Sequence, residues 1–225
     1  MLRILSIFAL AVITSPAFAQ LSSISNTEAT GGLKQSLHDG AAAAIAKLGA
    51  PNGFLGNPQV KIPLPPALKR VESALRLAGM RKQADDLVTS MNRAAEMAVP
   101  EAKTLIADSV SKMTLQDAKG ILTGGQTSVT DYFKRTTSAQ LTQRFLPIVK
   151  STTDKVGLAQ QYNSLAGQGA SLGLIKKDDA KIENYVTTKA LDGLYFMIGE
   201  QEKALRANPM GAASDIVKKV FGALK

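Results

Sequence analysis

The chain has 225 residues, with 27 Lys and Arg against 18 Asp and Glu, no Cys, no Trp and one His. Without Cys, disulfides, thiolate zinc sites and a Cys nucleophile are excluded, and one His cannot supply the several imidazoles of a typical catalytic zinc site. We therefore expect no metal site and no cofactor. A hydrophobic content of 45% with 20% charged residues is typical of a globular protein.

The first 19 residues have the pattern of a secretory signal peptide. Arg3 precedes an apolar run over residues 4–13, and Ala17 and Ala19 form the small-x-small pattern that signal peptidase accepts. The run is too short for a bilayer, which takes about 20 residues, although a buried helix or a membrane anchor is the alternative. Cleavage after Ala19 would remove Arg3 and no acid, which lowers the net charge from +9 to +8. We expect an exported, soluble protein, periplasmic if the source is Gram-negative, without a transmembrane anchor after cleavage.

Residues 20–225 are expected to form one helical domain, and the first helix is predicted over residues 25–48. Residues 25–28 have capping-box spacing and an Ala-rich segment follows, with Gly49 as the expected end. Gly31 and Gly32 weaken the first turns, so the start is expected nearer Leu33. His38 lies on this helix, and its neighbour Asp39 cannot share its helix face. We interpret His38 as an ordinary side chain.

Residues 49–66 are rich in turn formers and Pro and predict an extended strap. Long irregular segments of compact domains are often functional. The apolar side chains of the strap could pin it to the helices. Alternatively, the strap could present a surface loop of Gly53, Phe54, Leu55 and Asn57, with an exposed apolar patch at Phe54 and Leu55 that binds a partner.

The clearest helix is predicted over residues 80–98, after a helix over 67–78. Its apolar residues recur at i, i+3, i+4 and i+7, which places Asn92 at the edge of the apolar stripe and Arg93 and Glu96 toward the other side. These three residues are candidates for a polar core or a binding site. Pro100 predicts a break before a helix that runs to about residue 112.

Further helices are predicted in the second half of the chain, and each begins after a capping residue or a break. They start at residues 114, 128, 138, 158, 178 and 212, with Pro147 as a kink in the helix over 138–156. Residues 167–178 are expected to be a flexible loop, because their glycines lack the spacing and the preceding strand of a dinucleotide site. The last helix, 212–224, is expected to dock on the core, with a membrane surface as the alternative.

Asp192 lies in the most apolar part of the helix predicted over residues 178–207, which we expect at the centre of the bundle. An acid there should be desolvated unless it is paired, either with Lys189 or with an Arg such as Arg135. We interpret Asp192 as half of a structural ion pair, with a ligand-binding or catalytic acid as the alternative. The dispersed positive charge favours an anionic envelope component, or another envelope protein, as partner and disfavours nucleic acid.

Several strings of the chain together resemble a family of exported bacterial proteins catalogued as domain of unknown function 4197. They are NGFLGNP (52–58), KIPLP (61–65), MNRAAE (91–96), YFKRTT (132–137), FLPIV (145–149) and YVTTKALDGL (185–194). The resemblance covers about residues 33–221. It implies export and one mostly helical domain, and it implies no activity and no catalytic residues.

The prediction is a single-domain, all-α irregular bundle of about eight to ten helices. These helices wrap around residues 182–206 and are crossed by the 49–66 strap. The leading functional hypothesis is a non-enzymatic envelope protein that binds a ligand or a partner. The second is a carboxylate-dependent hydrolase of an envelope polymer, with Asp192 or Glu96 as the acid and Arg93 or Arg135 as an anion clamp. The third is a periplasmic lipid carrier with an apolar tunnel.

Overall fold

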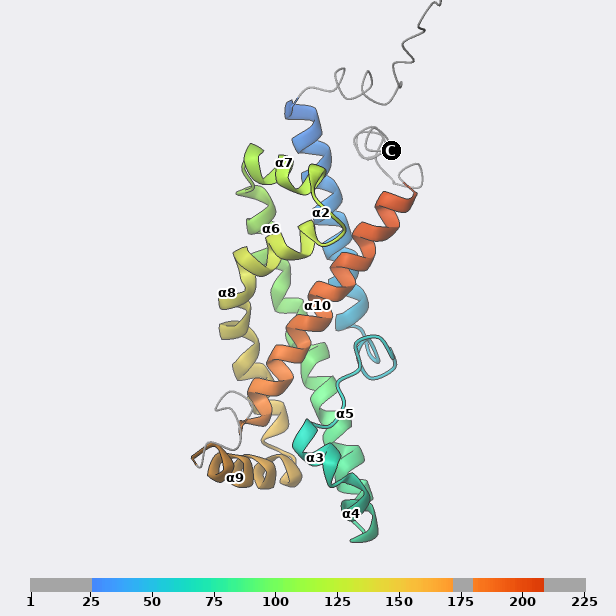
Figure 1. Ribbon diagram of the computed structural model, residues 1–225, viewed down its shortest axis with the longest axis vertical. Coiled ribbons are helices and arrows are strands. Elements are labelled where there is room, and N and C mark those ends of the chain that lie inside the picture. Colours follow the sequence, from blue (N-terminus) through green and yellow to red (C-terminus); the bar gives the residue numbers. More distant parts are fainter. Residues whose placement is uncertain (1–25, 172–179, 209–225) are drawn as a thin grey trace, which may run out of the picture.

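The computed structural model describes residues 26–171 and 180–208, and the regular structure of these residues is entirely helical. The helices are α2 (Asn26–Gly49), α3 (Pro66–Arg70), α4 (Glu72–Leu77), α5 (Arg81–Ala98), the 3-10 helix η1 (Val99–Glu101), α6 (Ala102–Ser111), α7 (Leu115–Thr123), α8 (Ser128–Thr153), α9 (Gly157–Ser171) and α10 (Ile182–Ala207) (Figure 1). The prediction of an all-α fold is confirmed. The predicted signal peptide, residues 172–178 of the predicted loop and the helix predicted over 212–224 lie outside the described residues.

Helix α10 is the central element of an elongated bundle. It crosses the bundle diagonally and packs against α8, α2, α5 and α9 (Figure 1). The aromatic side chains Phe133 and Phe145 of α8 are fully buried, as are Leu87 and Met91 of α5. These side chains remove a large apolar area from water, which holds the long helices together without disulfides.

Several helix ends lie where local signals predicted them. Helix α2 ends at Gly49, and Gly79 separates α4 from α5 with a φ of 74°, a conformation that Gly adopts without a steric penalty. Helix α7 begins with a capping box, in which the Thr114 hydroxyl accepts from the Asp117 amide and the Asp117 carboxylate accepts from the Thr114 amide. These ends depend on residues within one turn, so sequence alone finds them.

Other helices are longer or more broken than predicted. Helix α2 already begins at Asn26, α8 is one helix that continues through residue 138 and Pro147, and α9 continues to Ser171 through glycines predicted to be a loop. The helix predicted over 67–78 is instead divided into α3 and α4. Weak local propensity is commonly overridden by packing, and the buried Phe145 and Val149 on both sides of Pro147 show such packing. Within the described ranges, no helix is long and apolar enough to cross a bilayer.

Candidate functional site

The strap, residues 50–65, is fastened to α5 by the carboxylate of Glu96. Its Oε1 accepts hydrogen bonds from the amides of Phe54 and Leu55, both at 3.0 Å. Its Oε2 accepts from Nη1 of Arg93 at 2.5 Å, and Nη2 of Arg93 donates to Oδ1 of Asn52 at 2.9 Å. One side chain thus provides the acceptor that two amides of an irregular segment need.

Glu96 is only 5% exposed, although the spacing of apolar residues places it toward the more polar side of α5. The strap covers this face of α5, and helical periodicity contains no information about a segment that comes from elsewhere in the chain. Burial by itself would raise the pKa of Glu96. The Leu55 amide, the Arg93 guanidinium and the Phe54 amide outweigh burial and lower the pKa below its ordinary value.

Asn92, which is fully buried, fastens the next part of the strap. Its Oδ1 accepts from the amide of Ile62 at 2.8 Å, and its Nδ2 donates to the carbonyls of Ile62 at 2.9 Å and of Val88 at 2.8 Å. The side-chain amide therefore satisfies both backbone groups of Ile62 as a neighbouring strand would. The sequence indicated Asn92 because it is a polar residue at the edge of an apolar stripe. In the structure its side chain holds the strap on α5.

Phe54 is fully buried, so the expected apolar surface patch at Phe54 and Leu55 is wrong. The Phe54 ring lies against α10, where a Cβ on Gly193 would be 2.7 Å from Phe54 Cε1. A Cβ on Gly53 would be 2.3 Å from the carbonyl oxygen of Leu48, so the turn into the strap has no room for a side chain. Leu55 is half-buried. These residues pin the strap, as the first of the two interpretations held.

Helix α10 holds the other side of the strap. Nδ2 of Asn57 lies 3.9 Å from the sulfur of Met197, and the hydroxyl of Tyr185 donates to the carbonyl of Pro63 at 3.2 Å. The structure thus brings the α5 candidates and the strap candidates into one clamp. Arg135 and Asp192 are not part of it.

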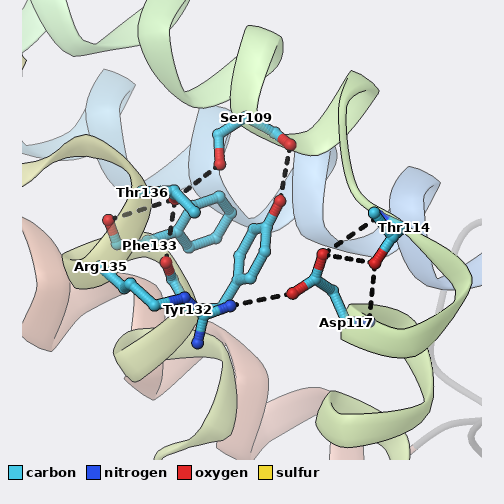
Figure 2. A network of polar contacts seen from close by, with 7 residues as sticks. All are labelled: Ser109, Thr114, Asp117, Tyr132, Phe133, Arg135 and Thr136. Atoms are coloured by element: carbon cyan, nitrogen blue, oxygen red, sulfur yellow. Dashed lines mark hydrogen bonds and ion pairs between the residues drawn. The ribbon is translucent and has the colours of Figure 1, made fainter.

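Arg135 belongs to a separate network that joins α6, α7 and α8 (Figure 2). Its Nη2 donates to Oδ1 of Asp117 at 2.9 Å, and its guanidinium lies 5.5 Å from the ring centroid of Tyr132. The Tyr132 hydroxyl donates to the carbonyl of Ser109 at 2.7 Å. Figure 2 shows the Tyr132 ring between Ser109 and the guanidinium of Arg135. The charge of Arg135 is therefore matched by Asp117.

Asp192 is more than half exposed, so the expectation that it is desolvated is wrong, while its expected partner Lys189 lies 3.3 Å away. Its position on α10 faces an opening in the molecular surface. This opening, the strap groove, has a volume of about 590 Å³. It is bounded by strap residues 59–63, the start of α8 and one face of α10.

The strap groove is positively charged. Its lining includes four lysines and two acids, namely Lys61, Lys134, Lys189, Lys203, Asp192 and Glu200. Asp192 pairs with Lys189 at 3.3 Å, and Glu200 pairs with Lys203 at 2.7 Å. Lys61 and Lys134 have no acidic partner within 4.0 Å in the described part of the chain, and Nζ of Lys134 lies 6.0 Å from the ring centroid of Tyr195.

The wall of the groove on α10 also has an apolar surface. Phe196 is 39% exposed, although it lies between buried positions of a central helix. A Cβ on Gly199 would be 2.9 Å from Oγ1 of Thr130, so Gly199 lets α8 approach α10 closely. One groove thus contains two unpaired ammonium groups and an exposed aromatic ring, which suits an anion with an apolar part.

Sequence reasoning missed a buried ion pair at the end of α10. Glu202 is 5% exposed and its Oε1 accepts from Nε and Nη2 of Arg206, both at 2.8 Å, while Nη2 also donates to the carbonyl of Ile121. Burial raises the pKa of Glu202, and Arg206 offsets only part of this effect. The i, i+4 spacing of the two residues was visible, but their burial depends on α7 and α8.

Among the described residues, no group of three or more His, Asp or Glu side chains is placed to hold a metal ion. His38 is half exposed, and its Nδ1 lies 3.2 Å from Oδ1 of Asp39. The two neighbours thus touch at the surface, although adjacent residues on a helix were expected to face apart. This exposed contact gives no geometry for a general base.

Fold and site define an all-α bundle in which a clamped strap borders a basic groove. The chain belongs to the family described as protein of unknown function (DUF4197), whose model matches residues 23–222. We find no match among curated proteins or among solved structures.

Proposed function

We propose that this protein is an exported, non-enzymatic binding protein, periplasmic in a Gram-negative cell, that takes a small anionic ligand with an apolar part in the strap groove. The observation that carries the proposal is the pair Lys61 and Lys134, which have no acidic partner within 4.0 Å among the described residues and line the same groove as the exposed Phe196. An ammonium group that is not neutralised within the protein attracts an anion more strongly than a paired one.

The groove favours binding over catalysis. Its two acids, Asp192 and Glu200, are eight positions apart on α10, which is about 12 Å along the helix axis at 1.5 Å per residue. Each acid pairs with a Lys of its own helix. Glycosidases place their two carboxyl groups about 5–9.5 Å apart. Nothing in the groove therefore favours the hydrolase hypothesis, and its open, lysine-rich walls do not favour an enclosed lipid tunnel.

Export is supported by the sequence of residues 1–19, with Ala17 and Ala19 at the expected cleavage position. The intact mass of the protein recovered from its own cells tests this part of the proposal. A mature chain that begins at Gln20 is expected, and a full-length chain that begins at Met1 would contradict it.

Binding can be measured with the Phe196→Trp variant, because the chain has no Trp and the new indole would be the only one. Three amphiphiles with the same chain length serve as probes, namely octanoate, octanol and octylammonium. We expect octanoate to change the indole emission at the lowest concentration and octylammonium at the highest. Equal affinities for octanoate and octylammonium would contradict an anion site.

Charge reversal identifies the lysines responsible. In the Phe196→Trp background, the double change Lys61→Glu and Lys134→Glu is expected to weaken octanoate binding by at least tenfold, which corresponds to about 1.4 kcal/mol. The matched control reverses two exposed lysines outside the groove, Lys103→Glu and Lys119→Glu. An equal loss in both double variants would show a general charge effect and would refute the site.

A further inference from the structure

A second surface of the protein, the α3–α4 tip, consists of residues 66–82. Helix α4 extends beyond the other helices at one end of the bundle (Figure 1). Helix α3 buries none of its residues, and the main contacts of α4 are with α3 and α5. The tip is therefore a projection, in which Ala67, Leu68 and Met80 are partly buried against the core. It is separate from the strap groove.

The tip exposes large apolar side chains. Leu77, the last residue of α4, is 90% exposed, and Val71, between α3 and α4, is 46% exposed. A single exposed Leu is ordinary on a protein surface. Two large apolar side chains on one projection are less ordinary, and the folded monomer gains almost no burial from Leu77.

The charge around these side chains is positive. Five basic residues lie on the tip, namely Lys69, Arg70, Arg76, Arg81 and Lys82. The last three pair with Glu72, Asp85 and Asp86. Lys69 and Arg70 have no acidic partner within 4.0 Å in the described residues. Val71 thus follows directly after two basic groups that are not neutralised, and Leu77 lies seven positions after Arg70.

We propose that the α3–α4 tip docks on an anionic lipid surface, with Leu77 and Val71 in the interfacial region of the bilayer and Lys69 and Arg70 at the headgroups. Apolar insertion combined with basic side chains is how short interfacial segments bind membranes. The shape of the tip favours a bilayer over a protein partner. A residue exposed to 90% at the end of a projection has no concave surroundings that would pack around a partner side chain.

Leu77→Trp converts the central residue of the tip into the only Trp of the chain. Addition of vesicles of phosphatidylglycerol and phosphatidylethanolamine is expected to shift its emission to shorter wavelength, because the indole leaves water. Vesicles of phosphatidylcholine alone are expected to cause a much smaller shift. The matched control is Leu115→Trp, since Leu115 is also exposed but lies on α7, and it should not respond. The absence of a shift at Leu77→Trp, or an equal shift at both positions, would overturn the proposal.

Charge and apolarity are separated by two further variants in a vesicle sedimentation assay with the otherwise unaltered chain. The double change Lys69→Gln and Arg70→Gln should weaken binding about 30-fold, at about fivefold for each charge, while Lys103→Gln with Lys119→Gln should change it little. Leu77→Asp should also weaken binding while circular dichroism stays the same, because Leu77 is almost fully exposed.

Two other results would overturn the lipid proposal. If the tip variants bind vesicles like the unaltered chain, the surface is not the docking site. If the unaltered chain is a dimer in light scattering and Leu77→Asp makes it a monomer, the tip is an interface between copies of the chain.

Discussion

Replacement of Glu96 by Ala tests whether the carboxylate of Glu96 holds the strap on α5. The substitution removes the acceptor of the Phe54 and Leu55 amides, which lie in a buried or half-buried part of the strap. An amide left without an acceptor costs about 1–3 kcal/mol. Arg93 is 39% exposed, so water can solvate its guanidinium and its lost pairing adds little. We expect a loss of about 2–5 kcal/mol of unfolding free energy.

The loss is measured by urea unfolding followed by circular dichroism, with Glu101→Ala as the control. Glu101 is an exposed acid close to Glu96 in sequence, 4.0 Å from Arg144, and its replacement should change stability by less than about 0.5 kcal/mol. The position of the strap gives a second readout. Lys61 is exposed, and trypsin should cut there faster in Glu96→Ala than in the control. A loss below about 1 kcal/mol with unchanged cleavage would refute the view that Glu96 fastens the strap.

Three further results are expected. The pKa of Glu96 is lowered in the folded state, so as the pH falls below 4.5 the unfolded state takes up a proton before the folded state does. The free energy of unfolding therefore decreases as the pH falls through the lowered pKa. The Glu96→Gln variant should lose this part of the pH dependence in acid titrations. The pKa of Glu202 is raised in the folded state, so its contribution to stability is present below pH 4.5 and is lost as the pH rises. The free energy of unfolding should therefore decrease above pH 4.5, and Glu202→Gln should make this decrease smaller. Gly193→Ala should lower the thermal midpoint, because crowding against Phe54 costs about 1–3 kcal/mol, whereas Gly120→Ala in open space should raise it through a helix gain of about 0.5–1 kcal/mol. A stabilised Gly193→Ala would show that Phe54 yields easily.

The clamp shows why part of the site could be predicted. Asn92 attracted attention as a polar residue on an apolar stripe, and the strap was recognised from its turn formers and prolines. Both signals are local. The contact between Asn92 and the strap is seen only in the tertiary structure. Asn92 and Ile62 are 30 positions apart, and no sequence pattern near either residue indicates that they are in contact.

Asp192 and Glu96 show why burial could not be predicted from the spacing of apolar residues. Asp192 was expected to be desolvated because its helix is apolar almost all round, yet it faces the strap groove, where the strap and α8 leave α10 uncovered. Glu96 was expected toward the more polar side of α5, and the strap buries it on that side. The spacing of apolar residues along a helix shows which of its faces is the more polar, but which segment covers a face depends on the rest of the chain.

The amino-acid sequence by itself determined the all-α class, the strap, several helix ends and the chemistry that 225 residues without Cys and with one His cannot perform. These properties depend on residue types and on spacings within a few turns. Only the tertiary structure decided that Phe54 is buried, that Glu96 and Asn92 hold the strap, and that Lys61 and Lys134 face one groove without acidic partners. The physical reason is that burial and ion pairing are set by neighbours far away in sequence, and the positive charge counted along the chain becomes a site only where the fold brings unpaired lysines together.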